Sequence, residues 1–161
     1  MSNAHAFRIG HGYDIHRLRP GGRLVIGGVV VAEDISADAH SDGDVAIHAL
    51  VDAILGALCQ PDIGEQFPNS DPRWAGADSA VFLKRAVELA AEQGYVVVNA
   101  DVTVQLENPK LKSFKSAMRK RLSEIVNAPV NIKAGTNEQC DAIGRGEAVA
   151  AHAVVLLALS Q

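Results

Sequence analysis

The sequence is poor in cysteine, aromatic residues and excess positive charge, and each shortage argues against a class of function. Its 2 cysteines, Cys59 and Cys140, form no C-x-x-C pair, so no disulfide framework is expected. Aromatic residues make up only 4% of the chain, too few to favour the stacking platforms of a single-strand nucleic-acid binder. A net charge of −4 argues against a broad surface for nucleic acid or anionic membrane.

Long apolar runs and internal divisions are also missing. No apolar run approaches the roughly 20 residues that span a bilayer. Residues 1–6 lack the basic start and the apolar core of a signal peptide. We therefore expect a cytoplasmic protein without a membrane segment. Because no repeat or linker divides residues 1–161, we expect one domain, with residues 1–6 as a disordered extension.

Hydrophobic periodicity and turn residues predict an alternation of strands and helices. The predicted strands are 7–15, 23–31, 95–106, 130–134 and 149–159, and the predicted helices are 44–59, 78 or 79 to 93, and 113–127. This order favours an α+β domain, a mixed β-sheet with helices packed on one face. Residues 61–77 are expected to form an unstructured loop, and a loop of that length is usually functional.

The apolar run 153–159 has no polar face. Two explanations stay open for it. It is either a central strand or a strand whose second surface is buried by another subunit.

One predicted helix carries polar side chains in an otherwise apolar sequence. Residues 44–59 are apolar on almost every side, which indicates a buried helix. Asp44, His48 and Asp52 interrupt this helix at spacings of four residues and therefore lie along one face. Burying even a neutral polar group without a partner costs roughly 2–7 kcal/mol, so these side chains must meet other polar atoms. We expect Asp44 or Asp52 to orient the His48 ring.

The polar partner of this helix is predicted at Asp14 and His16. Residues two apart on a strand point to the same face, so the carboxylate and the imidazole converge. With His48 they form a set of two imidazoles and one carboxylate, which leaves a tetrahedral Zn²⁺ one open position. The same set suits Fe²⁺, and residue types alone do not decide between the two metals. Taken in isolation, Asp14 and His16 also fit a polar strand end with a surface histidine.

Three loops carry groups suited to phosphate or to a hard cation. The segment His40–Asp44 precedes a predicted helix N-terminus, where free N–H groups favour an anion, although one of its side chains could simply cap the helix. Lys110 lies in a loop before a basic helix whose other cations are expected to face solvent. Thr136 could donate to a phosphoryl oxygen. Glu138 could bind Mg²⁺, although a lone loop carboxylate is more often solvated.

Several motifs together resemble one enzyme family over about residues 8–159. These motifs are Gly10–His16, Ile26–Val29, Ala39–Leu50, Asp62–Gly64 and Gly144–Glu147. They are similar to the 2-C-methyl-D-erythritol 2,4-cyclodiphosphate synthases. The resemblance implies a phosphorus–oxygen lyase of the non-mevalonate isoprenoid pathway. Such an enzyme converts 4-diphosphocytidyl-2-C-methyl-D-erythritol 2-phosphate to the 2,4-cyclodiphosphate and CMP, and works as a homotrimer with active sites at subunit interfaces.

The resemblance also implies roles for individual residues. It places Zn²⁺ on Asp14, His16 and His48, and Mg²⁺ or Mn²⁺ on Glu138 together with the substrate diphosphate. His40 and Thr136 are the implied catalytic pair. The implied substrate-binding residues are Asp14, His16, His40, Ser41, Asp62, Ile63, Gly64, Phe67, Pro68, Asn69, Ser70, Asp71, Leu106, Pro109, Lys110, Leu111, Lys112, Ala134, Gly135, Thr136, Asn137, Glu138 and Arg145.

The sequence departs from the family pattern at a few positions. Asn137 interrupts a run that is commonly rich in threonine, and Ala142 replaces an aromatic residue. His152 stands where the family often has an acidic residue on the trimer axis, which predicts that Arg145 loses a counter-charge.

Two other functions stay open at this stage. A phosphoester hydrolase would use the same metal to activate water. A non-catalytic trimer would use the metal only for stability.

Overall fold

A mixed five-stranded sheet forms the centre of the molecule. The structure is a computed structural model and describes residues 6–68 and 70–160. The strand order is β4-β1-β7-β5-β6, where β5 and β6 are parallel and the other pairs are antiparallel. A separate two-stranded sheet pairs β2 with β3. The strands are β1 Phe7–Pro20, β2 Leu24–Ile26, β3 Val29–Ala32, β4 Ile35–Ala37, β5 Tyr95–Gln105, β6 Val130–Gly135 and β7 Ala148–Leu159.

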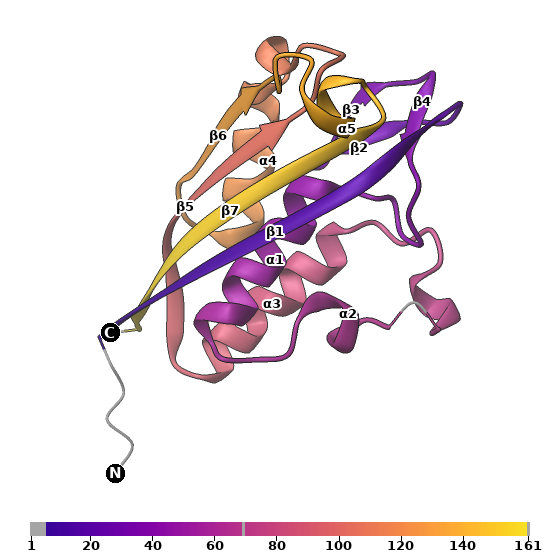
Figure 1. The fold of residues 1–161 in the computed structure, drawn as a ribbon. Helices are drawn as coiled ribbons and strands as arrows, with labels where there is room; N and C mark the ends of the chain where they lie inside the picture. Colours follow the sequence, from indigo (N-terminus) through magenta and orange to yellow (C-terminus); the bar gives the residue numbers. More distant parts are fainter. Residues whose placement is uncertain (1–5, 69, 161) are drawn as a thin grey trace.

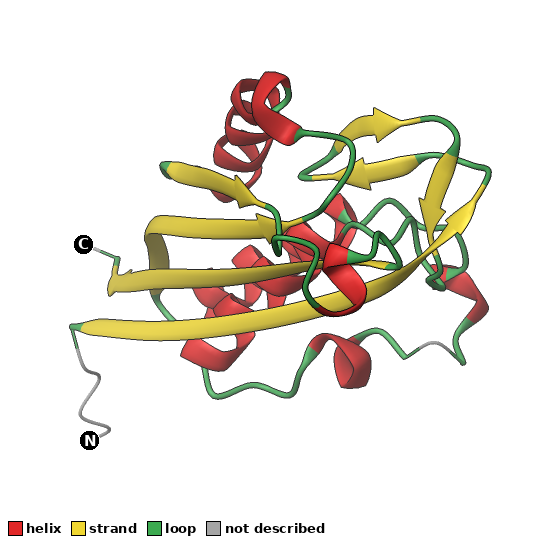
Figure 2. Ribbon diagram, turned by 45° about the horizontal axis from the view of Figure 1, so that its top comes forward, coloured by secondary structure: helices red, strands yellow, loops and turns green. Residues whose placement is uncertain are grey.

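The three long helices lie behind the main sheet in Figure 1, and Figure 2 shows the same layers from another side. The helix α1 packs on β1 and β7, α3 packs on α1 and β5, and α4 packs on β6. The α-helices are α1 Val45–Ala57, α2 Ile63–Gln66, α3 Ala80–Glu92, α4 Lys115–Val126 and α5 Asp141–Gly144, with 3₁₀ turns at Pro72–Trp74 and Leu111–Ser113. The predicted α+β class with a mixed sheet is confirmed.

Two glycines on β1 bring α1 unusually close to the sheet. A Cβ atom at Gly10 would lie 1.8 Å from the Ala53 carbonyl oxygen, and one at Gly12 would lie 1.9 Å from the Ala49 carbonyl oxygen. Any side chain at these positions would therefore push the helix away. Because His48 directly precedes Ala49, the same close packing brings its ring to β1, two residues beyond Gly12.

The structure corrects two element predictions. Residues 23–31 form two strands instead of one, because Gly27 and Gly28 adopt φ values of +59° and +71° and turn the chain back. Residues 61–77 contain α2 and a 3₁₀ turn. Both are capped by aspartate side chains, since Asp62 accepts from the Glu65 N–H and Asp71 accepts from the Arg73 N–H.

Residues 1–6 were expected to form a disordered extension, and the structure differs from this expectation at residue 6. Residues 1–5 lie outside the described ranges. The Ala6 carbonyl accepts a hydrogen bond of 3.0 Å from the Leu159 N–H, so this residue is tied to the end of β7. The short strand β4 and the short helix α5 were not predicted.

The terminal strand β7 is a central strand, which agrees with the first of the two explanations for its apolar sequence. It lies between β1 and β5. Its inner residues Ala153, Val155 and Leu157 are buried under the helices, whereas His152 and Val154 are exposed on the other face. We call this second side of the main sheet, which bears His152 and Val154, the open face.

Candidate metal centre

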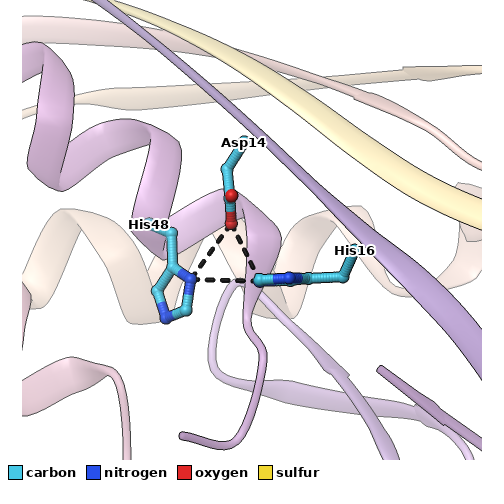
Figure 3. A group of neighbouring side chains, drawn as sticks. All are labelled: Asp14, His16 and His48. Atoms are coloured by element: carbon cyan, nitrogen blue, oxygen red, sulfur yellow. Dashed lines mark hydrogen bonds and ion pairs between the residues drawn. The ribbon is translucent and has the colours of Figure 1, made fainter. Parts of the chain in front are cut away.

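Three side chains from two elements converge at one point. Asp14 and His16 are alternate residues of β1 and so share its helix-facing side, and His48 lies on the first turn of α1. Figure 3 shows the three side chains meeting. The Asp14 Oδ2 atom lies 2.9 Å from His16 Nε2 and 3.0 Å from His48 Nδ1, and the two nitrogens are 3.1 Å apart. One carboxylate oxygen and two imidazole nitrogens in this arrangement suit a transition metal.

The electrostatics of the three groups favour charge separation in the metal-free protein. Burial raises the pKa of Asp14, but hydrogen bonds from His16 and His48 outweigh it and hold this pKa well below its usual range. Burial lowers the pKa of His48, but the hydrogen bond to Asp14 and the negative charges of Asp14, Asp44 and Asp42 together outweigh burial and raise this pKa above its usual value. A proton on His48 therefore occupies the position that a metal ion would take.

The second ring nitrogen of His48, Nε2, lies close to two hydroxyl groups. Its Nε2 atom lies 2.8 Å from Ser79 Oγ and 3.1 Å from Ser41 Oγ. Ser79 is the N-cap residue of α3 and is not among the site residues predicted from the sequence. Its only local signal is a serine before a helix, which resembles an ordinary cap.

The expectation that Asp44 or Asp52 orients His48 is wrong. The Asp44 carboxylate caps α1 and accepts from the backbone N–H groups of Gly27 at 2.8 Å and Gly28 at 2.6 Å. It thus ties the β2–β3 turn to the helix. The Asp52 carboxylate accepts from the Ile63 N–H at 2.8 Å. The N-cap Asp44 and the two polar residues His48 and Asp52 of α1 therefore have three different sets of partners.

A pocket of about 270 Å³ opens beside the three convergent side chains. It is lined by Asp14, His16, Asp38, Ala39, His40, Ser41, His48, Ile63, Gly64, Phe67, Trp74 and Phe82. The His40 Nε2 atom is buried there and has no hydrogen-bond partner among the described residues, which leaves it available to a ligand.

Two aromatic residues of this pocket, Trp74 and Phe82, were not predicted. The centroids of their rings lie 5.4 Å and 4.6 Å from the ring centroid of Phe67. These aromatic rings form the apolar wall of the pocket.

Other predicted residues of the 61–77 segment lie outside the pocket lining. Asp71 forms an ion pair of 2.6 Å with Arg73. Pro68 and Ser70 are exposed, and Asp62 caps α2. Asn69 lies outside the described residues.

A second pocket, of about 370 Å³, lies at the ends of β5 and β6. It carries three lysine side chains and is lined by Leu106, Lys110, Leu111, Lys112, Lys115, Ala134, Gly135 and Thr136. The Thr136 hydroxyl donates to Glu138 Oε1 at 2.8 Å. Asn137 donates to Asp141 at 2.9 Å, so its amide is already engaged. Pro109 belongs to the same loop but is not among the lining residues.

The two pockets are separated across the sheet. Gly135 of β6 pairs with Gln105 of β5, which pairs with Ala150 of β7, which pairs with Ile15 of β1. Three interstrand spacings therefore divide the backbone at Gly135 from that at Ile15, roughly 14 Å. Within one chain, the predicted residues His40 and Thr136 belong to different pockets.

The structure also corrects the expectation for Arg145. Its guanidinium is held by Glu147 through two hydrogen bonds of 2.9 and 3.1 Å, so it keeps a counter-charge. His152 lies elsewhere on the open face. Its Nδ1 atom is 3.1 Å from His11 Nε2, and its ring centroid is 4.7 Å from that of Tyr13.

A mixed sheet backed by helices, with a partly buried carboxylate–dihistidine cluster between one of its strands and a helix, defines a class of small α+β proteins with a candidate metal centre. Residues 7–158 match the model of the YgbB family, and the chain belongs to this family. In the described ranges, no helix is both long and apolar enough to cross a membrane.

Similar proteins extend this comparison. The chain is 53% identical over 154 residues to the chloroplastic 2-C-methyl-D-erythritol 2,4-cyclodiphosphate synthase of Oryza sativa subsp. japonica, covering 94% of this chain and 69% of the relative. It is 51% identical over 153 residues to the synthase of Symbiobacterium thermophilum, covering 93% and 98% of the two chains. The solved CDP complex of IspF from Plasmodium falciparum has a TM-score of 0.85 and 33% identity, covering 98% of this chain and 100% of that one.

Proposed function

We propose that this protein is a 2-C-methyl-D-erythritol 2,4-cyclodiphosphate synthase. It converts 4-diphosphocytidyl-2-C-methyl-D-erythritol 2-phosphate to the cyclic diphosphate and CMP, as a phosphorus–oxygen lyase of the non-mevalonate isoprenoid pathway. The observation that carries this proposal is the convergence of Asp14, His16 and His48 beside a pocket, in a chain whose relatives at 53% and 51% identity are synthases by name.

The reaction brings anionic groups together, because the 2-phosphate must attack the β-phosphorus of its own diphosphate. We assign Zn²⁺ to Asp14, His16 and His48, where it would act as a Lewis acid toward phosphoryl oxygens. His40, with its unpartnered Nε2 atom in the pocket, supplies a fixed hydrogen bond to the developing charge. Since both reacting groups belong to one molecule, orientation alone contributes roughly 7–11 kcal/mol and no nucleophilic side chain is needed.

The substrate's sugar and cytidine portions are assigned to different pockets. The pocket beside the metal centre takes the methylerythritol portion against the 61–77 segment, with Ile63, Gly64 and Phe67 in contact. The lysine-bearing pocket takes the cytidine diphosphate portion, because Lys110 and Lys112 match its charge. The bound CDP of the Plasmodium falciparum relative supports a cytidine nucleotide as ligand. Glu138 holds Mg²⁺ or Mn²⁺ together with the diphosphate.

We assign a homotrimer with active sites between subunits. Within one chain His40 and Thr136 line different pockets. The backbones at Ile15 and Gly135 are roughly 14 Å apart, which supports a site completed by a second copy. The open face supports assembly, since Phe7 and Ile9 are 64% and 73% exposed there in the single chain. The lysine pocket of one copy then completes the metal pocket of the next.

The decisive test of the reaction is product analysis. The protein is incubated with the diphosphocytidyl substrate, Zn²⁺ and Mg²⁺ in ¹⁸O-labelled water, and the products are followed by ³¹P NMR and mass spectrometry. We expect CMP and a cyclic diphosphate without solvent oxygen. A linear product that carries ¹⁸O would indicate a hydrolase. Unfolding on chelation, without any turnover of the metal-loaded protein, would indicate a metal-stabilised trimer.

A further inference from the structure

Ser79 occupies a buried position between a carboxylate and a predicted metal ligand. Its side chain is 0% exposed, although serine is usually found at the surface. Its hydroxyl lies 2.8 Å from His48 Nε2 and is hydrogen-bonded to Asp42 Oδ1. The Ser79 backbone N–H also donates to Asp42 Oδ2 at 3.1 Å.

Hydrogen bonds link Asp42 to Ser79 and Ser79 to His48. The donor in each of them follows from the number of available protons. The Asp42 carboxylate receives backbone N–H groups from Ser79 and Asp44, an arrangement that suits the ionised, acceptor-only form. The Ser79 hydroxyl therefore donates its single proton to Asp42. The same oxygen can then only accept from His48, so the proton of the neutral His48 ring lies on Nε2.

This tautomer leaves the other ring nitrogen free for a metal. With the proton on Nε2, the lone pair of His48 Nδ1 faces Asp14 and His16, which lie 3.0 and 3.1 Å away. The opposite tautomer would place a proton at the point where a metal ion must bind.

We propose that Ser79 is a positioning residue: together with Asp42 it fixes the tautomer and orientation in which His48 binds metal through Nδ1. This inference rests on the metal centre of the proposed function. A carboxylate behind a metal-binding histidine normally acts directly, whereas here a serine hydroxyl lies between them.

Ser41 is the other hydroxyl within reach of His48 Nε2, and it is the weaker candidate. Its distance is longer, 3.1 Å, and its side chain lines the pocket, where a ligand competes for it. Its oxygen also accepts from the Gly43 N–H. Ser79 has neither competitor, because it is fully buried outside the pocket lining.

Two backbone hydrogen bonds join the segment that contains Asp42 to the end of the 61–77 segment. Asp42 N–H donates to the Ala77 carbonyl at 3.1 Å, and Gly76 N–H donates to the His40 carbonyl at 2.8 Å. The chain then enters α3 directly after Ser79. The loop end is therefore tied through the backbone to residues 40 and 42, next to the Asp42 carboxylate that holds Ser79.

The test measures metal affinity and the His48 proton, and neither requires substrate. The zinc dissociation constant is measured by chelator competition on the full chain. We expect Ser79→Ala to weaken zinc binding roughly ten- to hundred-fold and Asp42→Asn to weaken it less. Ser123→Ala is the matched control, since it removes a serine hydroxyl that accepts from the Val130 N–H at 3.0 Å. It should leave the constant unchanged.

NMR of ¹⁵N-histidine-labelled, zinc-loaded protein gives the second readout. We expect a slowly exchanging proton on His48 Nε2 that is lost or shifted in Ser79→Ala. Zinc coordination through Nε2 in the wild type would overturn the proposal, and this measurement stands even if the variant does not fold. Zinc affinity in Ser79→Ala equal to that of Ser123→Ala would also overturn it. Normal zinc binding without cyclisation would instead contradict the proposed function.

Discussion

The two faces of β1 carry different kinds of side chain, with the candidate metal ligands on one face and exposed apolar residues on the other. On the helix-facing side, Gly10 and Gly12 let α1 rest against the strand, and the next residues on that side are Asp14 and His16. On the open face, the alternating residues include Ile9 and Tyr13, which are exposed in the single chain. The strand period of two residues places these two sets a residue apart in sequence and on opposite sides of the sheet. On the helix-facing side, the three candidate metal ligands come from one chain, whereas the open face carries exposed apolar side chains that the proposed assembly would cover.

Loss of a metal ligand should have the largest effect on function and little effect on the fold. In His48→Ala we expect zinc binding and cyclisation to fall below detection, because only Asp14 and His16 remain of the three proposed metal ligands. The apolar side chains of α1 are unchanged, so far-ultraviolet circular dichroism should keep its helical signal. Metal analysis of the purified variant checks this expectation. Full zinc occupancy would remove His48 from the metal centre.

A methyl group on the helix-facing side of β1 should have the largest effect on stability. In Gly12→Ala the new Cβ atom meets the Ala49 carbonyl at 1.9 Å, and backbone cannot move aside cheaply. We expect the free energy of unfolding to fall by about 3 kcal/mol or more. Denaturant titration measures it.

Gly56→Ala provides the control, since its Cβ would meet only the His11 carbonyl at 3.8 Å. In this helix position alanine should stabilise the protein by up to about 1 kcal/mol. Equal losses in Gly12→Ala and Gly56→Ala would contradict the close-packing argument.

A charge on the open face should break the assembly and spare the fold of the chain. We expect Ile9→Asp to sediment as a monomer, because burying a carboxylate among apolar side chains is costly. Val81→Asp introduces the same charge at an exposed position on α3 and should sediment as the wild type does. Analytical ultracentrifugation distinguishes them. A trimeric Ile9→Asp would exclude this part of the open face from the interface.

The pH dependence of metal-free stability should be a smaller effect with a defined sign. The lowered pKa of Asp14 adds stability above its unfolded value near 3.9, and this stability is lost as pH falls through the folded value. The raised pKa of His48 adds stability below its unfolded value near 6.5, and this stability is lost as pH rises through the folded value.

The stability difference between metal-free wild type and Asp14→Asn should therefore be largest between about pH 4 and 6.5. We expect it to reach about 1.5–3 kcal/mol there, the range for a hydrogen bond to a charged group. Urea titrations at several pH values measure it. A difference that grows steadily above pH 7 would contradict the assignment.

The parts of the fold that follow local rules could be predicted from the sequence. Apolar periodicity located α1, α3 and α4, and the alternation of β1 placed Asp14 and His16 on one face. The polar interruption of an apolar helix identified His48 as a residue that needs a partner. Each of these inferences uses neighbours within a few positions.

The remaining features depend on contacts between distant segments. Ser79 and Asp42 are 37 positions apart, and nothing in either segment alone indicates that they meet at His48. The hydrogen-bond partners of Asp44 and Asp52 depend on the positions of the β2–β3 turn and of α2 in the folded chain. A helix pattern fixes which face a side chain shares, and tertiary packing decides which partner it meets.

The measurement that tests the central claim most directly is complementation between two inactive variants. His48→Ala lacks the metal ligand and Thr136→Ala lacks the hydroxyl of the lysine-bearing pocket. If each active site combines these pockets from two copies, an equal mixture dissociated and reassembled should recover about one quarter of the wild-type activity, from random pairing of intact halves. If each site belonged to one chain, every site would carry a defect. Cyclisation no higher than that of the separate variants, with mixed trimers demonstrated by native mass spectrometry, would contradict the shared site.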